Sequence, residues 1–276
     1  MLNKFYVEEH IKKALMEDIG YEDITTENLA EETDIISAEL NTRNDGILCG
    51  INVFKQVFEI LSDKIDIKLY YKDGNEIKKG DKIADIKGPA RYILMGERLA
   101  LNYIQRMSGI ATETQKYRNA IKPYKAKIAD TRKTTPNFRV FEKYAVQVGG
   151  GALHRFNLSD CAMIKDNHIK LAGSITNAVK KLREKISFTH KIEVECDTFE
   201  QVKEALESGA DIIMLDNMDI ETMKKSVVLI NSKAIIEASG NVNLNTINSI
   251  ASCGVDIISS SAIVAKAPTL DLALDM

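Results

Sequence analysis

The sequence lacks the features that mark several classes of protein. No run approaches the ~18 consecutive apolar residues of a membrane-spanning helix, so no membrane partner is expected. It has no basic tail or block and its formal net charge is −3, which argues against a nucleic-acid partner. The first twenty residues mix acids with apolar side chains at helical spacing, so we do not expect a secretory signal there.

Cysteine is scarce and dispersed. The four cysteines, Cys49, Cys161, Cys196 and Cys253, form no Cys-x-x-Cys pair. This spacing is not that of a disulfide framework or a zinc site, and it indicates reduced thiols of a cytoplasmic protein. With 45% apolar and 28% charged residues, the 276-residue chain has an ordinary globular composition. Its length allows one large α/β unit or two modest domains.

The first part of the chain, to about residue 105, has a mixed pattern. Apolar residues at helical spacing predict helices over 7–18 and 52–61, and another begins near residue 90 and runs to about 121. Short β-prone runs between them are separated by turn signals at Asp73-Gly74 and Gly80-Asp81. This pattern predicts an α/β unit built on an antiparallel sheet.

From about residue 127 the pattern becomes regular. Short apolar runs predict strands at 127–132, 144–151, 161–168, 191–196, 211–217, 234–240 and 256–261. Helical patterns separate most of them, including one over 198–209 with a Thr198–Gln201 capping box. Repeated βα units with continuous apolar strands predict a parallel sheet covered by helices, as in an α/β barrel.

Most of these predicted strands end in polar side chains. In an α/β barrel such side chains converge on one mouth, where the chemistry takes place. Ordinary loop polarity explains an isolated Asp or Ser equally well. It explains Lys165 and Glu195 less well, because both adjoin very apolar strands and a buried charge needs a partner or a ligand. The polar strand ends are Arg132, Lys133, Lys165, Asp166, Glu195, Asp216, Ser239 and Ser259.

Positive charge is concentrated around the predicted mouth. Arginine forks bind carboxylate or phosphate at two points, and lysine acts as a point charge. Surface salt bridges are the alternative for any single residue, but a cluster at successive strand ends favours an anionic substrate. The cluster comprises Arg98, Arg132, Lys133, His154, Arg155 and Lys165.

Small residues and acids complete the predicted mouth. Gly149–Gly151 could form a turn or allow a close backbone approach. Ser239-Gly240 and Ser259–Ser261 follow late strands, where free N–H groups commonly cradle a phosphate. Glu195 and Asp216 could bind Mg²⁺, accept from sugar hydroxyls or act as acid and base. Composition and spacing thus predict a barrel enzyme for a small, multiply anionic substrate.

Residues 130–169 resemble the central signature of the quinolinate phosphoribosyltransferase family, DTRKT-P-R-EKYAV-GGG-HR-GL-D--IKDNH. The family is also called nicotinate-nucleotide pyrophosphorylase (carboxylating). Supporting motifs precede the signature at EDITT and ERLALNYIQRMSGIAT, and follow it at IEVEC, MLDNM and EASGNV. The resemblance therefore covers nearly the whole chain in the expected order.

The resemblance implies a type II phosphoribosyltransferase fold. An N-terminal α/β sandwich over 1–105 precedes an open α/β barrel over 106–266, and segment 267–276 packs back on the first domain. It implies a glycosyltransferase (a pentosyltransferase) that converts quinolinate and 5-phosphoribosyl-1-pyrophosphate to nicotinate mononucleotide, pyrophosphate and CO₂. This is a magnesium-dependent step of de novo NAD biosynthesis. A homodimer, or a hexamer, with the active site at the subunit interface is also implied.

The resemblance assigns several positions to quinolinate. Arg98 matches an arginine that reaches the substrate from the neighbouring subunit. Arg132, His154 and Arg155 match the group around the two quinolinate carboxylates, and Thr131 lies beside them in the signature.

The resemblance assigns another set to phosphoribosyl pyrophosphate. Lys133 and Lys165 match lysines near the substrate and the pyrophosphate. Glu195 and Asp216 match acids at the ribose hydroxyls and at Mg²⁺, which they contact through substrate or water. These four are the expected catalytic residues. The loops expected to hold the 5-phosphate are Ser239, Gly240, Asn241, Ser259, Ser260 and Ser261.

One stretch departs from the family pattern. The family reads ISVGALTHS after the last strand, whereas residues 258–266 read ISSSAIVAK. Ser261 stands where the family has glycine, and the Thr-His-Ser tail is absent. If that glycine requires a positive φ, the phosphate site is weakened, but a serine hydroxyl could instead donate to the phosphate.

Three alternatives compete with this interpretation. The related protein of molybdenum-transport operons shares the fold but departs from the intact IKDNH. A Schiff-base aldolase could use Lys133 or Lys165. A non-catalytic ligand-binding protein would not need the complete charged set, which favours the phosphoribosyltransferase.

Overall fold

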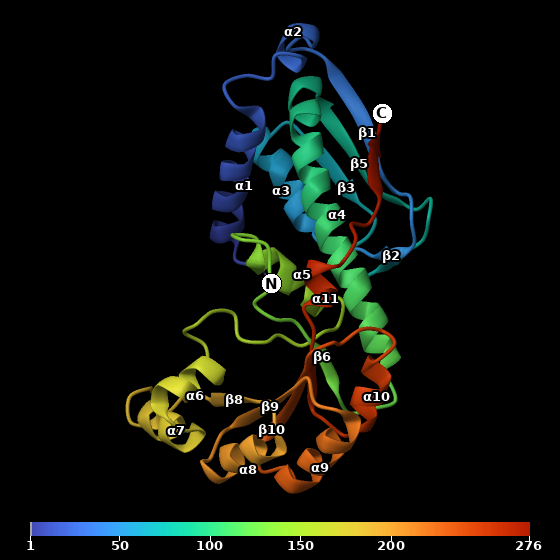
Figure 1. Ribbon diagram of the computed structural model, residues 1–276. Helices are drawn as coiled ribbons and strands as arrows, with labels where there is room; N and C mark the ends of the chain where they lie inside the picture. Colours follow the sequence, from blue (N-terminus) through green and yellow to red (C-terminus); the bar gives the residue numbers. More distant parts are fainter. Residues whose placement is uncertain (1) are drawn as a thin grey trace. The chain divides into compact units, whose positions relative to one another are not determined.

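The computed structural model describes residues 2–276, which form two compact units (Figure 1). The first unit contains the chain up to Gln115 together with Thr135–Gly150 and Ala267–Met276. The second unit contains Lys116–Thr134 and Gly151–Lys266. The predicted division at 105/106 differs from these units, because residues 106–115 and 135–150 pack within the first one. No helix of the described residues is long and apolar enough to cross a membrane.

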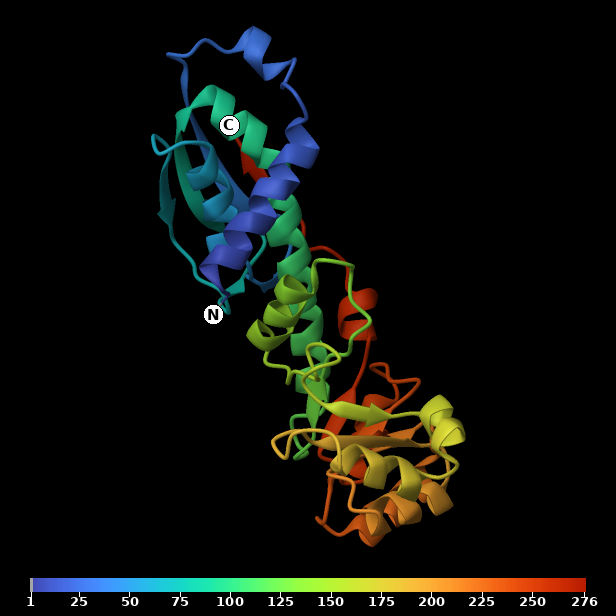
Figure 2. The ribbon, with the colours of Figure 1, turned by 90° about the vertical axis from the view of Figure 1, so that its left-hand side faces the viewer.

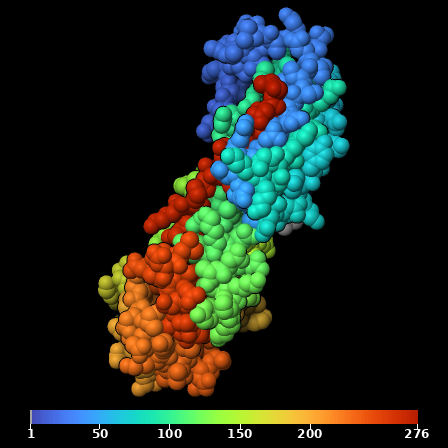
Figure 3. All heavy atoms as spheres, turned by 90° about the vertical axis from the view of Figure 1, so that its right-hand side faces the viewer, coloured from blue at the N-terminus to red at the C-terminus, as the bar shows by residue number. Residues whose placement is uncertain are grey.

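A four-stranded antiparallel sheet forms the first unit. Leu40 lies opposite Ala84 on one neighbouring strand and Leu274 on the other, and all three are buried, so one face of the sheet meets the core. The C-terminal strand thus returns to this unit, and Figure 3 shows it in red beside the blue N-terminal residues. The strand order is β12 (Leu272–Asp275), β1 (Ile35–Thr42), β5 (Lys82–Pro89) and β3 (Asp66–Leu69), with a separate ladder of β2 (Gly46–Ile47) and β4 (Glu76–Ile77).

Helices α1 (Lys4–Ile19), α3 (Ile51–Leu61) and α4 (Ala90–Ala120) confirm the helices predicted from apolar spacing. They lie along the sheet of the first unit (Figure 2), and α4 continues into the second unit beyond Gln115. Helix α3 shows why the spacing is informative: it buries Val53, Phe54, Val57 and Phe58, which lie on one side of a 3.6-residue period. A short helix, α2, spans Thr26–Leu29.

The second unit is an open barrel. Its parallel sheet has the order β6 (Lys127–Ala129), β11 (Ile257–Ser259), β10 (Ile235–Ser239), β9 (Ile212–Asp216), β8 (Ile192–Cys196) and β7 (Ala162–Ile164). Beyond β6, Ala129 makes one further parallel bridge to Ala152. The connecting helices are α6 (Asp166–Ala172), α7 (Ile175–Arg183), α8 (Phe199–Glu207), α9 (Ile220–Ile230), α10 (Ile247–Ser252) and α11 (Ala262–Ala265). The capping box predicted at Thr198 is present at the start of α8.

The strand predicted over 144–151 is wrong. Residues Arg139–Val148 form helix α5, which belongs to the first unit and buries Phe141, Ala145 and Val146. The apolar residues of this stretch fit a helical period once Phe141 is included, so the short window beginning at residue 144 misled the prediction. Strand-like pairing begins only at Ala152.

The first two of the three glycines that follow α5 have separate roles. A Cβ at Gly149 would overlap the carbonyl oxygen of Ala111 and lie 2.8 Å from Cβ of Thr114, both on α4. Gly150 has a φ of +84°, which favours glycine. Both roles expected of this stretch are therefore present, the close backbone approach at Gly149 and the turn at Gly150.

Candidate active site

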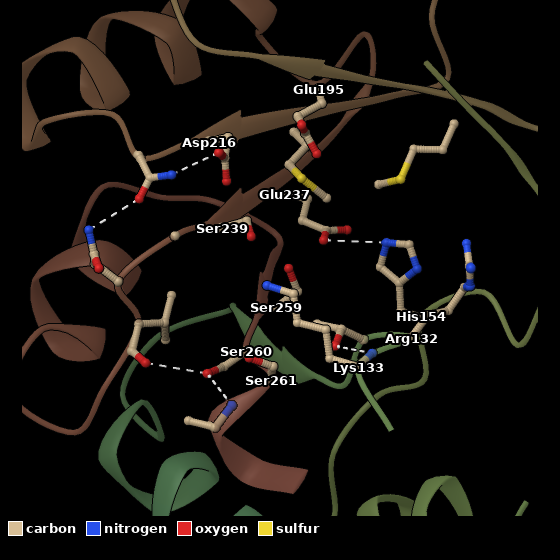
Figure 4. Close-up of a pocket in the computed structure, with 18 of the residues that line it drawn as sticks. Arg132, Lys133, His154, Glu195, Asp216, Glu237, Ser239, Ser259, Ser260 and Ser261 are labelled. Carbon is tan, nitrogen blue, oxygen red and sulfur yellow. Dashed lines mark hydrogen bonds and ion pairs between the residues drawn. The ribbon is translucent and has the colours of Figure 1, made fainter. Parts of the chain in front are cut away.

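A cavity of about 700 Å³ lies at the carboxyl ends of the barrel strands, within the second unit. We call it the mouth cavity (Figure 4). Every predicted site residue except Arg98 lines it, so the second unit alone assembles nearly the complete predicted set. These residues are Thr131, Arg132, Lys133, His154, Arg155, Lys165, Glu195, Asp216, Ser239, Gly240, Asn241, Ser259, Ser260 and Ser261.

Strand register explains why residues so far apart in sequence meet here. Ser239 on β10 lies opposite Asp216 on β9. Glu195 on β8 lies opposite Met214, which points to the same face as Asp216 because side chains alternate along a strand. Parallel strands end at one edge of the sheet, so their terminal side chains share one space.

The cationic side of the mouth cavity is carried by β6 and the segment bridged to it. The bridge at Ala152 brings His154 and Arg155 next to the residues that follow β6. Buried Asp130 fixes this arrangement, because its Oδ1 accepts from the backbone N–H of His154 at 2.8 Å. Arg155 donates through its guanidinium to the carbonyl oxygen of Cys161 at 2.9 Å. Figure 4 shows Arg132 and His154 across the cavity from Asp216.

Two buried glutamates beneath His154 were not predicted. Nε2 of His154 lies 3.3 Å from a carboxylate oxygen of Glu193 and 3.5 Å from one of Glu237. Glu193 on β8 and Glu237 on β10 are 1% and 4% exposed. The signal was available, since both are charges inside apolar strands, the same reason that singled out Glu195.

This buried cluster binds a proton tightly. Burial lowers the pKa of His154, but hydrogen bonds and attraction from Glu193 and Glu237 outweigh it and raise the pKa to about 10. Burial also raises the pKa of Glu193. Nδ1 faces the backbone N–H of Arg155 at 2.8 Å, so in the neutral ring Nε2 carries the proton. In the imidazolium Nδ1 also carries a proton and can no longer accept from the Arg155 N–H. Attraction from the two carboxylates outweighs the loss of this hydrogen bond.

Lys165 and Glu195 form a second ion pair at the mouth. Lys165 follows β7, and its Nζ contacts Oε2 of Glu195 on β8. The side chain of Lys165 is 43% exposed, so this pair is open to competition from ligands. The backbone N–H of Lys165 donates to Nδ1 of His168 at 3.0 Å, and this contact orders the loop that follows β7.

The loops after β10 and β11 form the small-residue side of the cavity. Ser260 donates to the carbonyl oxygen of Val242 at 3.3 Å and accepts from the N–H of Ala262 at 3.2 Å, which ties the two loops together. Ser261 has a φ of −72°, an ordinary right-handed value. The serine therefore needs no glycine-like backbone, and the concern about a positive φ at this position is removed.

Arg98 is exposed on α4 in the first unit and does not line the mouth cavity. The four cysteines are free, as expected from their spacing. Burial raises the pKa of Cys161, which is half-buried near Arg155, and also that of the more deeply buried Cys196. We therefore assign no nucleophilic role to these two thiols.

Comparisons with known proteins give a consistent result. The family model for the N-terminal domain of quinolinate phosphoribosyl transferase matches residues 23–108, and the C-terminal domain model matches residues 110–275. A probable nicotinate-nucleotide pyrophosphorylase [carboxylating] of Bacillus subtilis (strain 168) is 40% identical over 275 residues, covering 100% of this chain and 95% of the relative. The chloroplastic nicotinate-nucleotide pyrophosphorylase [carboxylating] of Arabidopsis thaliana is 41% identical, with 96% and 81% covered.

Solved structures agree. The crystal structure of NadC from Streptococcus pyogenes has a TM-score of 0.97 and 39% identity, covering 100% of this chain and 98% of that one. The nicotinate-nucleotide pyrophosphorylase from Francisella tularensis has a TM-score of 0.95 and 40% identity, covering 100% and 97%. The predicted sandwich-plus-barrel fold is thereby confirmed.

Proposed function

The chain belongs to the quinolinate phosphoribosyl transferase family, and from this premise we propose how its mouth cavity performs the reaction. The chain is a pentosyltransferase of NAD biosynthesis that acts on quinolinate and phosphoribosyl pyrophosphate (PRPP) and releases nicotinate mononucleotide, pyrophosphate and CO₂. One observation carries the assignment to this cavity: the complete cationic, acidic and small-residue set of the second unit lines a single space.

Quinolinate binds on the cationic side. The substrate carries two adjacent carboxylates, so Arg132, Arg155 and the His154 imidazolium meet a matching charge. Thr131 contributes a hydroxyl beside them. The Arg155 guanidinium is already held by the Cys161 carbonyl, so little side-chain freedom is lost on binding.

Transfer begins when the bond between ribose C1 and pyrophosphate breaks. Positive charge develops on the ribose and negative charge on the leaving group. Lys133 and Lys165 stabilise pyrophosphate, while Glu195 and Asp216 hold the ribose hydroxyls. Lys165 is paired with Glu195 in the free protein, so pyrophosphate competes for Lys165 and releases the Glu195 carboxylate for the ribose.

The quinolinate nitrogen then bonds to C1, and the ring becomes a pyridinium. Loss of CO₂ from the adjacent carbon leaves an electron pair that the positive nitrogen stabilises, and a proton takes the place of the carboxylate. No organic cofactor is needed for this step. The protein's part is to hold the ring and keep its carboxylates fixed.

The 5-phosphate binds to the loops after β10 and β11. Ser239, Gly240 and Asn241 line one side, and the remaining contacts come from Ser259, Ser260 and Ser261. Serine hydroxyls and backbone N–H groups are suitable donors to phosphate. The Ser261 hydroxyl is an added donor relative to the family glycine.

Magnesium is proposed as the cofactor, near Glu195 and Asp216. The Asp216 carboxylate has one oxygen engaged by Asn217, so the two acids suit a Mg²⁺ ion held through PRPP and water rather than a closed protein cage. Mg²⁺ would supply charge neutralisation of the leaving pyrophosphate. The buried His154–Glu193–Glu237 group suits it less, since both carboxylates already face Nε2.

We further propose a cytoplasmic homodimer, or a hexamer, in which Arg98 completes the site of a neighbouring subunit. Exposure of Arg98 and its absence from the mouth cavity of its own second unit support this.

Arg98→Ala and Asp216→Ala proteins should each be inactive. An equal mixture of the two variants, refolded together, should recover up to about a quarter of wild-type activity. About half of the dimers then contain one subunit of each variant, and one of the two sites in such a dimer is intact. Absence of recovery would leave Arg98 outside the neighbour's site.

The overall proposal is tested by incubating purified protein with PRPP and Mg²⁺, with quinolinate or nicotinate in separate tubes. Nicotinate mononucleotide and CO₂ should form from quinolinate only. Equal product from nicotinate would mean that the cation cluster does not select the second carboxylate. Absence of product with quinolinate would contradict the proposed quinolinate phosphoribosyl transfer.

A further inference from the structure

We propose that Asn217 is a positioning residue that couples the Asp216 carboxylate to the loop at Gly240–Asn241. The inference rests on the proposed function, which gives Asp216 a ribose hydroxyl and gives the loop the 5-phosphate of PRPP. Asn217 follows β9 directly and lines the mouth cavity. Sequence reasoning gave this residue no role.

The backbone of Asn217 is held by the neighbouring strand. Its N–H donates to the carbonyl oxygen of Ser239 at 2.9 Å, which extends the β9–β10 ladder past the Ser239–Asp216 pair. Its φ is +51°, in the left-handed region that asparagine tolerates better than most residues. The chain therefore turns at the point where the two strands end.

The side-chain amide of Asn217 uses both of its ends. Nδ2 donates to Oδ2 of Asp216 at 2.8 Å, and Oδ1 accepts from Nδ2 of Asn241 at 3.2 Å. The orientation of the amide is fixed by chemistry, because the Asp216 carboxylate can only accept. One planar group thus spans the end of β9 and the loop after β10.

Gly240 makes room for this bridge. A Cβ on Gly240 would overlap the amide of Asn217, and these amide atoms are the nearest neighbours that it would meet. Gly240 also has a φ of +91°, and Asn241 has a φ of +50°. The loop is therefore shaped against Asn217 itself, and the glycine is needed for both conformation and contact.

The bridge connects two contact points of one substrate. The ribose hydroxyls and the 5-phosphate belong to PRPP, and their separation is set by the sugar. A fixed distance between Asp216 and the loop therefore favours PRPP, while quinolinate on the cationic side is not affected. A positioning role predicts a selective effect on PRPP, whereas a merely structural role predicts a general loss of stability.

Asn217→Gly removes the amide and keeps a residue that adopts a positive φ freely. Asn231 is the matched control, because it has a φ of +44°, ends α9 and does not line the mouth cavity. We expect Asn217→Gly to raise the KM for PRPP by roughly 3- to 10-fold and to lower kcat by a similar factor, as for the two hydrogen bonds that the substitution removes. The KM for quinolinate should stay within about twofold, and Asn231→Gly should resemble wild type.

Asn217→Asp adds a second test, since it keeps the acceptor for Asn241 but places a carboxylate against Asp216. It should be more damaging than Asn217→Gly, because like charges meet where a donor stood. Wild-type kinetics in either variant would overturn the inference, and so would equal increases in both KM values.

Failure of the proposed function is recognised separately. Asp216→Asn keeps the shape of the side chain but removes its charge, and it should raise the KM for PRPP and lower kcat. If it has no effect, the assignment of Asp216 to the ribose fails. If it is damaging while Asn217→Gly is silent, only the positioning role of Asn217 is lost.

Discussion

Replacing Glu237 by Gln tests whether the two buried glutamates hold a proton on His154. Glutamine keeps the volume and a hydrogen-bonding group but removes one of the charges that face Nε2. Glu237 is 4% exposed, and its oxygen lies 3.5 Å from the ring. Solvent therefore screens the interaction weakly, so the change in charge should act strongly on His154, and it also removes the repulsion by which Glu237 raises the pKa of Glu193.

The expected effect is large. A unit charge at this distance attracts an imidazolium by about 5 kcal/mol at an effective dielectric constant of about 20. Since about 1.4 kcal/mol changes an equilibrium tenfold, the affinity of His154 for its proton should fall by up to about three orders of magnitude. The pKa of His154, raised to about 10 in the wild type, should move down toward the range where histidine normally titrates.

The free energy of unfolding should also depend on the protonation of His154. The folded pKa of His154 lies above its unfolded value of 6.5. The protonated ring therefore contributes its full stabilisation of the folded state below about pH 6.5, and this stabilisation is lost as pH rises toward 10. The difference in unfolding free energy between wild type and Glu237→Gln should therefore narrow as pH rises over that interval. Urea denaturation at several pH values measures it.

NMR of the imidazole rings gives the direct assay. The chain has four histidines, so single substitutions assign each signal. The wild-type His154 ring should stay protonated between about pH 6 and pH 8.5, whereas the ring in Glu237→Gln should titrate within that range. A wild-type ring that titrates near its unperturbed pKa, or one that the substitution does not change, would refute the reasoning.

Other substitutions and conditions test other parts of the molecule. Gly149→Ala should lower the unfolding free energy by about 1–3 kcal/mol, because its Cβ overlaps a carbonyl on α4 although its φ of −70° suits alanine; urea denaturation measures the loss, and unchanged stability would contradict the overlap. Arg132→Ala and Arg155→Ala should each raise the KM for quinolinate roughly 10- to 100-fold and lower turnover, and unchanged kinetics in both would assign them a structural role. Chelation of Mg²⁺ should abolish transfer, with recovery on adding it back; full activity without it would remove the magnesium proposal.

The barrel could be predicted well from the sequence, because its strands are short continuous apolar runs for which few other structural assignments are plausible. The mouth could also be predicted, since parallel strands end at one edge whatever their loops do. Helix α5 was missed because its apolar residues satisfy both a strand and a helix over a short window. The helical period becomes visible only when the window includes Phe141, which is buried together with Ala145.

Pairings across the barrel were harder to predict than positions. The joint role of Glu193 and Glu237 is apparent only in the structure, where β8 and β10 place both carboxylates beside His154. Asn217 likewise gains its role from Gly240, a residue on the next strand connection. The sequence can mark Glu193 and Glu237 as charges inside apolar strands, but only the register of the parallel sheet reveals the partner of each residue.

The two ion pairs of the mouth have similar chemistry but opposite exposure, and this difference separates their roles. The side chains of His154 and its glutamates are at most 11% exposed, so substrate cannot replace those partners without leaving a buried charge uncompensated. The side chains of Lys165 and Glu195 are 43% and 19% exposed, so a polyanion can compete for the lysine, as the proposed mechanism requires. Rising salt should therefore weaken the Lys165–Glu195 pair and leave the His154 cluster intact. PRPP binding should consequently depend on ionic strength more steeply than the protonation of His154 does.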